Sequence, residues 1–230
     1  MRIDKLLSNL KYGSRKDIKE LIKNQAITLN DEFVKSPSIK INPDLDIIKV
    51  YGEEVTYFKQ LNLMIYKPRG YLSANHDHMH QTIFELLDDE VSRYDLKIAG
   101  RLDLDSEGLL ILTTSGTLAH KITSPNTHLA KVYEVILDKK INDYTQLLKG
   151  VIIKDGKGNE YLAKALAITK LAEDTLTISI DTGKFHQVRR MFEAIGYQVI
   201  NLKRVQIGNL KLGNLKPGEY QTFKEYDLFD

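Results

Sequence analysis

The sequence predicts an α+β fold in two domains, a small one over residues 1–58 and a larger one over 59–230. Strand-like segments recur through the chain without the regular alternation of strands and helices that builds a parallel sheet. The polar stretch 52–60 separates a segment that opens with two helical patterns from a longer segment rich in strands. We therefore expect the larger domain to hold a mixed, mostly antiparallel sheet flanked by helices.

The small domain is expected to begin with two short helices. Apolar residues at helical spacing predict a helix over 3–10, and Gly13 ends it. Ser14 and Asp17 then have the spacing of a capping box at the start of a second helix.

Two short strands are expected to follow these helices. They are predicted at 26–29 and 47–51, and Asn30-Asp31 forms the turn after the first. The polar stretch 52–60 is expected to be a linker, although apolar residues interrupt it.

The larger domain is expected to contain most of the strands. We predict a turn at 67–70, a short helix over 82–87, and a helix over 185–195 that Gly196 closes. Alternating apolar residues should place Tyr133 on the buried face of its strand. The predicted strands are 61–66, 109–113, 132–137, 161–168 and 175–181.

Composition excludes several classes of protein. Of 230 residues, 42% are hydrophobic and 28% are charged, as in globular proteins and unlike collagen, disordered chains or membrane bundles. The absence of cysteine excludes disulfides, thiolate metal sites and a cysteine nucleophile. Charged residues near Met1 stand where a signal peptide needs an apolar run. We expect a cytoplasmic protein with no membrane segment.

Charge is unevenly distributed although the net charge is only +2. Residues 1–23 carry seven basic and three acidic side chains, and residues 183–216 carry seven basic side chains against Glu193 alone. Residues 85–107 carry eight acids against three basic residues. This pattern suggests a partly basic surface that faces a polyanion, although one such cluster by itself is more often a solvated helix face.

The loop before the predicted strand 109–113 is the most informative segment. AGRLDLDSEGLLILTTSG (99–116) places Arg101, Asp103 and Asp105 in a polar loop that a core strand supports. Such loops present reactive groups on a rigid scaffold, but acidic loops are also common without catalysis.

This loop resembles the central motif of the pseudouridine synthases, and most closely that of the branch that acts on ribosomal RNA. Four other motifs of the family follow the same order along the chain. They are LMIYKPRGY (63–71), ITSPNTHLAKVYEV (122–135), TGKFHQVRRMFEAIG (182–196) and LKPGEY (215–220). Residues 1–50 resemble the RNA-binding domain of ribosomal protein S4. The resemblance covers nearly the whole chain.

The resemblance implies that the chain isomerises one uridine of ribosomal RNA to pseudouridine. The segment 186–190 is more similar to enzymes of the small subunit than to those of the large subunit. The small-subunit RNA, free or in a partly assembled particle, is the expected partner of a monomeric enzyme. The isomerisation changes no oxidation state and uses no group donor, so we expect no cofactor and no metal.

Residue roles follow from matching the motifs. The catalytic carboxylate is implied to be Asp103, although attack on the sugar and removal of a sugar proton both remain open. A cation beside it would lower its pKa and orient it, and Arg189 is the candidate, a role that Arg190 could share. Tyr133 is implied to stack on the uracil and to assist proton removal from carbon 5.

Access to the uridine requires that it be flipped out of the RNA stack. Arg101 matches the residue that fills the vacated space or holds the flipped nucleotide. Lys67 and Arg69 are weaker candidates for phosphate contacts. In the first domain, the candidate phosphate contacts are Arg2, Lys5, Arg15 and Lys16.

The first domain departs from its family at two positions. Asn24 and Asp31 stand where relatives usually have glycine, and both residue types tolerate left-handed backbone better than most. We therefore expect the fold to survive.

Several other interpretations stay open. The chain could be a large-subunit rRNA pseudouridine synthase, a non-catalytic rRNA-binding assembly module, or a nucleoside hydrolase that releases free uracil. The histidines of 76–80 suggest a metal site only weakly, because no distant ligand is evident. Asp103 and Asp105 could imitate a glycosidase pair, but the family motif assigns catalysis to the first.

Overall fold

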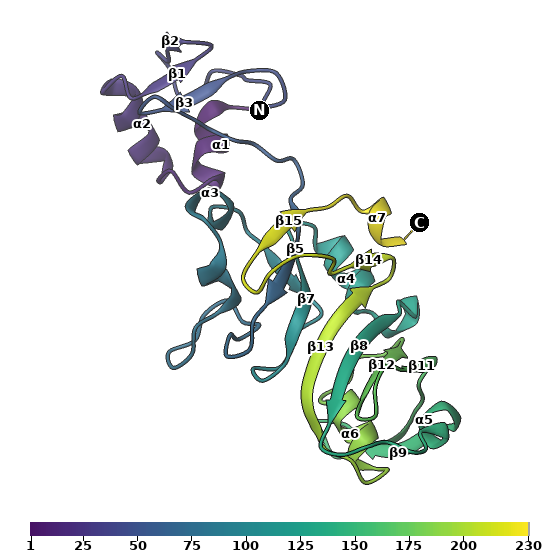
Figure 1. Cartoon of the computed structure of the whole chain (residues 1–230). Helices are drawn as coiled ribbons and strands as arrows, with labels where there is room; N and C mark the ends of the chain where they lie inside the picture. The colour runs from purple at the N-terminus through teal and green to yellow at the C-terminus, as the bar shows by residue number, and fades with distance from the viewer. Residues whose placement is uncertain (230) are drawn as a thin grey trace. The chain divides into compact units, whose positions relative to one another are not determined.

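The computed structural model describes residues 1–229 and divides into two compact units. The first unit consists of Met1–Leu61 and Leu87–Asp95, and the second of Asn62–Leu86 and the chain from Leu96 onward (Figure 1). The chain thus leaves the second unit after Leu86, adds a segment to the first, and returns. The predicted boundary between residues 58 and 59 stays a prediction.

The first unit pairs two helices with a small antiparallel sheet whose strand order is β2-β1-β3-β4. The capping box is confirmed: the Ser14 hydroxyl accepts from the Asp17 amide, and the Asp17 carboxylate accepts from the Ser14 amide at 2.8 Å. The elements are α1 (Ile3–Asn9), α2 (Arg15–Lys23), β1 (Ile27–Leu29), β2 (Glu32–Phe33), β3 (Ile48–Val50) and β4 (Glu53–Glu54).

Two expectations for the first unit need correction. The polar stretch 52–60 is not a simple linker, because β4 pairs with β3 and Val55 is buried. Asn24 has a right-handed backbone with φ −82°, and the left-handed residue is the next one, Gln25, at φ 56°. Asp31 is left-handed as expected, at φ 67°.

Helix α3 (Asp89–Ser92) fastens the returning segment to the first unit. The Tyr94 hydroxyl donates to the Thr56 carbonyl at 3.0 Å and accepts from the Phe58 amide at 2.9 Å. The Lys11 ammonium donates to the Ser92 carbonyl at 3.0 Å. The segment therefore packs as part of this unit.

The second unit is built on a sheet with the strand order β11-β12-β8-β13-β7-β5-β15 (Figure 1). Every pairing between these strands is antiparallel except β13 with β7, so the prediction of a mixed, mostly antiparallel sheet is confirmed. The strands are β5 (Asn62–Lys67), β7 (Glu107–Thr113), β8 (Lys131–Leu137), β11 (Ala167–Lys170), β12 (Thr175–Ile180), β13 (Val199–Ile207) and β15 (Tyr220–Thr222).

Smaller elements complete the second unit. Strand β6 (Lys97–Ala99) pairs with β7, and β14 (Leu210–Lys211) pairs with β13. A separate two-stranded sheet joins β9 (Val151–Lys154) to β10 (Glu160–Ala163). The helices are α4 (Gly116–Thr123), α5 (Thr145–Lys149), α6 (Gln187–Glu193) and α7 (Tyr226–Phe229), with 3-10 turns at Ile83–Leu86 and Pro125–Thr127.

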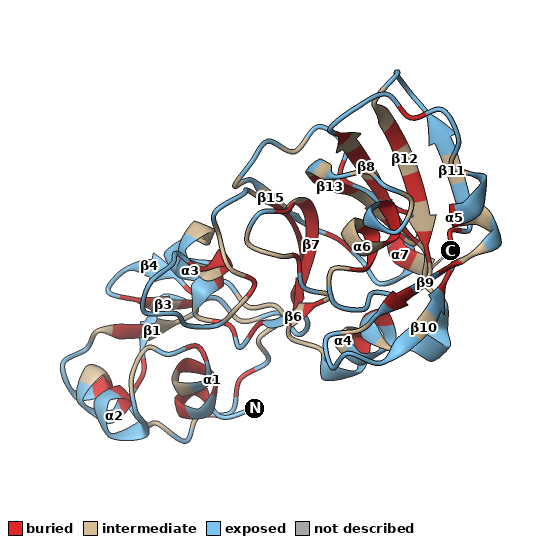
Figure 2. Cartoon of the chain, turned by 90° about the horizontal axis from the view of Figure 1, so that it is seen from below, coloured by how far each residue is buried: buried red, intermediate tan, exposed pale blue. Residues whose placement is uncertain are grey.

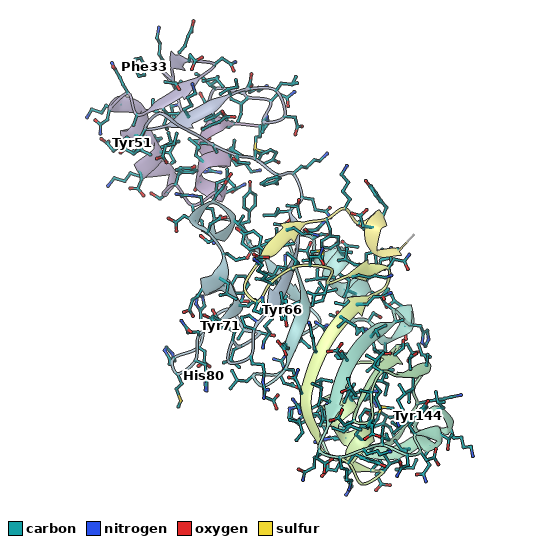
Figure 3. All side chains as sticks on the ribbon, in the orientation of Figure 1. Phe33, Tyr51, Tyr66, Tyr71, His80 and Tyr144 are labelled. Atoms are coloured by element: carbon teal, nitrogen blue, oxygen red, sulfur yellow. The ribbon has the colours of Figure 1, made fainter. Side chains whose placement is uncertain are left out.

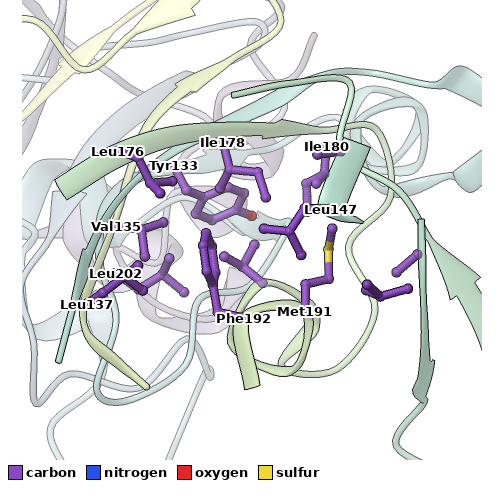
Figure 4. Packing of buried hydrophobic residues seen from close by; sticks show 14 of the residues in the cluster. Tyr133, Val135, Leu137, Leu147, Leu176, Ile178, Ile180, Met191, Phe192 and Leu202 are labelled. Carbon is purple, nitrogen blue, oxygen red and sulfur yellow. The ribbon is translucent and has the colours of Figure 1, made fainter. Parts of the chain in front are cut away.

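Two hydrophobic clusters hold the second unit together. In one, Phe192 and Met191 of α6 pack beneath the apolar side chains of β8, β12 and β13 (Figure 4). In the other, α4 and α7 pack against β5 and β7. The inner strands of the sheet, such as β7, are accordingly buried, whereas the edge strand β11 is largely exposed (Figure 2). The expected alternation along β8 is confirmed, because Tyr133, Val135 and Leu137 are all buried.

Three expectations for the second unit were incomplete. The predicted strand 161–168 is two strands in different sheets, because β10 pairs with β9 whereas β11 pairs with β12. The predicted helix 185–195 begins only at Gln187, because His186 has a left-handed backbone with φ 51°. The long strand β13 was not predicted.

Within residues 1–229, every helix is too short or too polar to cross a lipid bilayer.

Candidate active site

A cleft of about 410 Å³ opens in the second unit. Five segments line it: the end of β6 with the loop that follows, the end of α4 with the 3-10 turn after it, the start of β8, the segment that leads from β12 into α6, and the middle of β13. The cleft brings together Arg101, Asp103, Tyr133 and His186, which are up to 85 positions apart in sequence (186 minus 101).

Hydrogen bonds fix the loop that carries Asp103 at both ends. The Ser73 hydroxyl donates to the Leu102 carbonyl at 2.8 Å and accepts from the Leu102 amide at 3.1 Å. On the other side, the Ser106 amide donates to the Asp103 carbonyl at 3.1 Å. The loop is therefore a rigid support for the carboxylate, as a reactive group requires.

Lys67 supports this loop from inside the protein. Its side chain is fully buried, and its ammonium donates to the carbonyls of Ser106 at 2.7 Å and Pro68 at 3.0 Å. Burial lowers the pKa of Lys67 to about 8, an effect that the nearby charges of Asp103 and Asp105 partly oppose. The expectation of a phosphate contact is wrong, because Lys67 has no exposed surface to offer.

Asp103 keeps 36% of its side chain exposed to the cleft. Its carboxylate lies 3.5 Å from the Nε2 atom of His186. An exposed carboxylate on a fixed loop can reach a substrate atom that enters the cleft.

Arg189 does not pair with Asp103, contrary to expectation. Its guanidinium forms an ion pair with Asp105 at 2.9 Å and donates to the Val199 carbonyl at 2.9 Å and to the Ser106 hydroxyl at 3.3 Å. The Nε atom of Arg189 is buried without a hydrogen-bond partner. Arg189 thus braces the Asp103 loop through its neighbours.

Arg190 also differs from its expected role. Its guanidinium donates to the Lys154 carbonyl of β9 and lies 5.0 Å from the ring centre of Phe185. Phe185 in turn stacks on His186 with ring centres 3.8 Å apart. Arg190 therefore supports the aromatic side of the cleft and is not among the residues that line it.

Tyr133 lines the cleft from β8 and is only 6% exposed. Figure 4 shows its ring among the apolar side chains of the first cluster. Its hydroxyl lies 3.5 Å from the Nη1 atom of Arg204, its cross-strand neighbour on β13. The position suits a ring that forms one wall of a base-binding pocket.

Sequence reasoning missed Arg204, which is fully buried in the sheet. Its guanidinium donates to the Leu109 carbonyl at 2.7 Å and to the Gly100 carbonyl at 2.6 Å. These bonds tie β13 to β7 and to the start of the Asp103 loop. A lone arginine in an unpredicted strand offered no signal by which sequence could have found it.

Tyr66 and Glu107 form a second polar link beside this region. The Tyr66 hydroxyl donates to Glu107 at 2.7 Å, and Asn201 donates to the same carboxylate at 2.9 Å, which joins β5, β7 and β13. Burial and this negatively charged partner raise the pKa of Tyr66.

The remaining predicted residues are exposed. Arg101 lies on the rim of the cleft, and Arg69 donates to Asn201 at 3.4 Å. In the first unit, Lys5, Arg15 and Lys16 are exposed.

Arg2 differs from these three because its guanidinium pairs with the buried carboxylate of Asp4 at 2.8 Å. The hydrogen bond from Arg2 lowers the pKa of Asp4. Arg2 thus has a structural partner, although half of its side chain remains exposed.

The histidines of 76–80 lie on an exposed loop, where His80 is near its outer end (Figure 3). The His80 ring contacts Asp77 at 3.3 Å. In the part of the chain that the structure describes, no three His, Asp or Glu side chains are placed to hold a metal ion.

Comparison with known proteins shows the family to which this chain belongs. Residues 61–194 match the model of the RNA pseudouridylate synthases, and residues 1–47 match the S4 domain. The chain belongs to the RNA pseudouridylate synthase family. It is therefore an RNA pseudouridine synthase that carries an S4 RNA-binding domain, and the α+β fold expected from the sequence is confirmed.

Several members of the family are similar over almost their whole length. A protein of Bacillus subtilis described as an uncharacterized RNA pseudouridine synthase is 39% identical, covering 99% of this chain and 97% of that protein. Ribosomal small subunit pseudouridine synthase A of Vibrio cholerae is 36% identical, with 99% and 98% covered. A crystal structure of a pseudouridylate synthase aligns with a TM-score of 0.67 and 31% identity, with 99% and 98% covered.

Proposed function

We propose that this pseudouridine synthase converts a uridine of small-subunit (16S) ribosomal RNA to pseudouridine, with Asp103 as the catalytic carboxylate. The observation that carries the proposal is the cleft in which Asp103, Arg101 and Tyr133 converge from two distant segments. The choice of RNA rests on relatives of Vibrio and Escherichia coli that are named as small-subunit enzymes and are 33–36% identical.

Asp103 is proposed to act on the ribose. Breaking the bond between the base nitrogen and the sugar builds positive charge on the anomeric carbon, which a carboxylate can stabilise or trap. The exposed carboxylate is held on a loop that is fixed at both ends, so it can approach the sugar without rearrangement. The reaction changes no oxidation state, so the proposal includes no cofactor and no metal.

Base flipping is proposed to bring the uridine into the cleft. Extrusion of a stacked base costs roughly a few kcal/mol, which contacts in the pocket must offset. Tyr133 offers its ring to the uracil from the buried wall, and Arg101 is exposed on the rim where it could occupy the space the base leaves.

The S4 domain is proposed to hold the RNA through its exposed basic side chains. Lys5 at the first helix and Arg15 and Lys16 at the start of the second are the candidates. Arg2 contributes less, because Asp4 neutralises it. We propose that the enzyme works as a monomer in the cytoplasm, on free RNA or on a partly assembled particle.

The experiment uses unmodified small-subunit rRNA, both free and bound to ribosomal proteins, with large-subunit rRNA alongside. Purified protein and its Asp103→Asn variant are incubated with each RNA, and pseudouridine is mapped by carbodiimide labelling and primer extension. We expect one new stop in small-subunit rRNA that is absent with Asp103→Asn. Circular dichroism and RNA binding of the variant serve as controls for folding.

The other outcomes each contradict part of the proposal. A stop only in large-subunit rRNA would reassign the substrate. Undiminished activity of Asp103→Asn would remove the catalytic role of this residue. Release of free uracil would indicate a hydrolase.

A further inference from the structure

Two buried cations lie side by side in the wall of the cleft. Lys131 is 7% exposed and Arg204 is 1% exposed, yet both line the cavity. Neither side chain forms an ion pair with a carboxylate of residues 1–229. Charged groups are rarely buried without a partner, so this pair needs a physical reason.

The sheet directs both cations to the place where Tyr133 lies. Lys131 and Tyr133 are two positions apart on β8, so their side chains project from the same face of the strand. Arg204 is paired across the sheet with Tyr133, and its Nη1 atom is 3.5 Å from the tyrosine hydroxyl. The three groups therefore form one wall of the cleft.

The wall is electropositive. Burial and the charge of Arg204 lower the pKa of Lys131 to about 8, which leaves it mostly protonated at neutral pH. The charge of Asp181, which also lines the cleft, partly opposes this effect, and its carboxylate contacts the ring of His128 at 2.9 Å. An anion that entered the cleft would relieve the repulsion between the two cations.

The reaction itself produces such an anion. When the bond between N1 and the anomeric carbon breaks, its electron pair goes to N1, and the uracil carries a negative charge spread over N1, O2 and O4. This holds whether Asp103 attacks the anomeric carbon or removes the 2′ proton. The uracil then bonds to that carbon through C5, the proton of C5 leaves, N1 gains a proton, and Asp103 is restored.

We propose that Lys131, supported by Arg204, binds the detached uracil anion and stabilises it while the base turns. Lys131 is then a catalytic residue that contacts the leaving base, and Arg204 both adds charge and positions Tyr133. The inference rests on the proposed chemistry at Asp103. A phosphate of the bound RNA is the other anion that could occupy the wall, and measurements of rate and of binding separate the two.

The first experiment compares Lys131→Met with the wild type in single-turnover assays on RNA that carries uridine or 5-fluorouridine. Fluorine stabilises the uracil anion and so reduces the need for a cation. On uridine RNA, we expect Lys131→Met to cleave the glycosidic bond about 100-fold more slowly than the wild type. On 5-fluorouridine RNA, the difference in rate between the two proteins should be smaller by about tenfold or more. Affinity for RNA should not change.

Lys170→Met is the matched control. The Lys131 ammonium donates to the Leu129 carbonyl at 3.0 Å, and the Lys170 ammonium likewise donates to the Ile141 carbonyl at 2.6 Å, but Lys170 does not line the cleft. This variant should keep wild-type rates. Lys131→Met should fold, because methionine removes a buried charge that has no carboxylate partner and that is costly to keep away from water, and thermal denaturation checks this.

The second experiment needs no RNA, so its result does not depend on which RNA the enzyme modifies. Binding of 5-nitrouracil, an anion at neutral pH, is compared with binding of uracil, which is neutral. We expect the wild type to prefer the anion by about tenfold or more, which corresponds to about 1.4 kcal/mol, and Lys131→Met to lose that preference.

The contradicting results are distinct. The inference would be overturned if Lys131→Met lost the same factor in cleavage rate on both RNAs. It would also be overturned if Lys131→Met still preferred 5-nitrouracil over uracil. Weaker RNA binding with a smaller salt dependence would assign Lys131 to a phosphate instead. A wild type that modifies no RNA but prefers 5-nitrouracil through Lys131 would refute the proposed function and leave the anion site standing.

Discussion

Gly108 allows the closest approach of two backbones beside the active site. It pairs with Arg204 in the parallel contact between β7 and β13. A Cβ atom added at Gly108 would lie 2.7 Å from the Arg204 amide nitrogen and 2.9 Å from its carbonyl carbon, with the carbonyl oxygen closer still. Backbone atoms of a central strand cannot rotate away, so Gly108→Ala must force the strands apart.

The size of the effect follows from two contributions. Gly108 has φ +107°, outside the conformations that alanine adopts readily, and such strain costs about 1–3 kcal/mol. Overlap in a packed interior adds about 1–3 kcal/mol. We expect Gly108→Ala to lower the free energy of unfolding by about 4 kcal/mol, near the upper end of single substitutions. A loss of this size lowers the melting temperature by about 10 °C in a protein of this length.

Gly158→Ala separates strain from overlap. Gly158 also has a positive φ, +87°, but a Cβ atom there would meet nothing within 4 Å. This control should lose only the strain contribution, about 1–3 kcal/mol.

Urea denaturation followed by circular dichroism gives both free energies, and pseudouridine formation is measured on the same proteins. Activity should fall in Gly108→Ala, because a displaced β13 moves Arg204 away from Gly100 and Tyr133. Equal destabilisation in the two variants would refute the argument from close approach.

Two further predictions concern the loop that carries Asp103. The pKa of Lys67 is about 8 in the folded protein and 10.5 in a free lysine, so between these pH values the unfolded chain binds more protons than the folded one. The free energy of unfolding of the wild type should therefore rise with pH in this range, compared with Lys67→Met, by up to about 3 kcal/mol. Urea titrations of both proteins at pH 7 to 10.5 measure this, and parallel curves would show that burial does not shift the pKa of Lys67. Asp105→Asn should lower the free energy of unfolding by less than about 1 kcal/mol, because its ion pair with Arg189 is half-exposed. The rate of pseudouridine formation by this variant should stay within about tenfold of the wild-type rate. A loss as complete as that expected of Asp103→Asn would mean that Asp105 takes part in catalysis.

Local sequence patterns were sufficient wherever the structure is decided by neighbours in the chain. The capping box of Ser14 and Asp17 and the alternating burial of β8 both follow from side chains a few positions apart. The order of the family motifs along the chain likewise indicated the enzyme class. The pattern failed at 161–168, because nothing local shows that β10 and β11 join different sheets.

Strand β13 shows why the rest could not be predicted. Its pairing with β8 shifts register at Val199/Asn201 and at Arg204/Gln206, so buried and exposed residues do not alternate cleanly along it. A strand without period-2 alternation has no signature in one sequence. Arg204 lies on this strand, so its place beside Lys131 and Tyr133 in the wall of the cleft could not be predicted from the sequence.

The sequence by itself determined the class of fold, the S4 domain and the loop that carries Asp103, because these depend on local periodicity and on motifs. Only the tertiary structure decided which charges meet: it paired Arg189 with Asp105, turned Arg190 toward β9, and buried Lys67 beneath the loop. The physical reason is that an ion pair depends on distances of a few ångströms between residues far apart in the chain. Those distances are set by sheet register and helix packing, and charge type alone does not encode them.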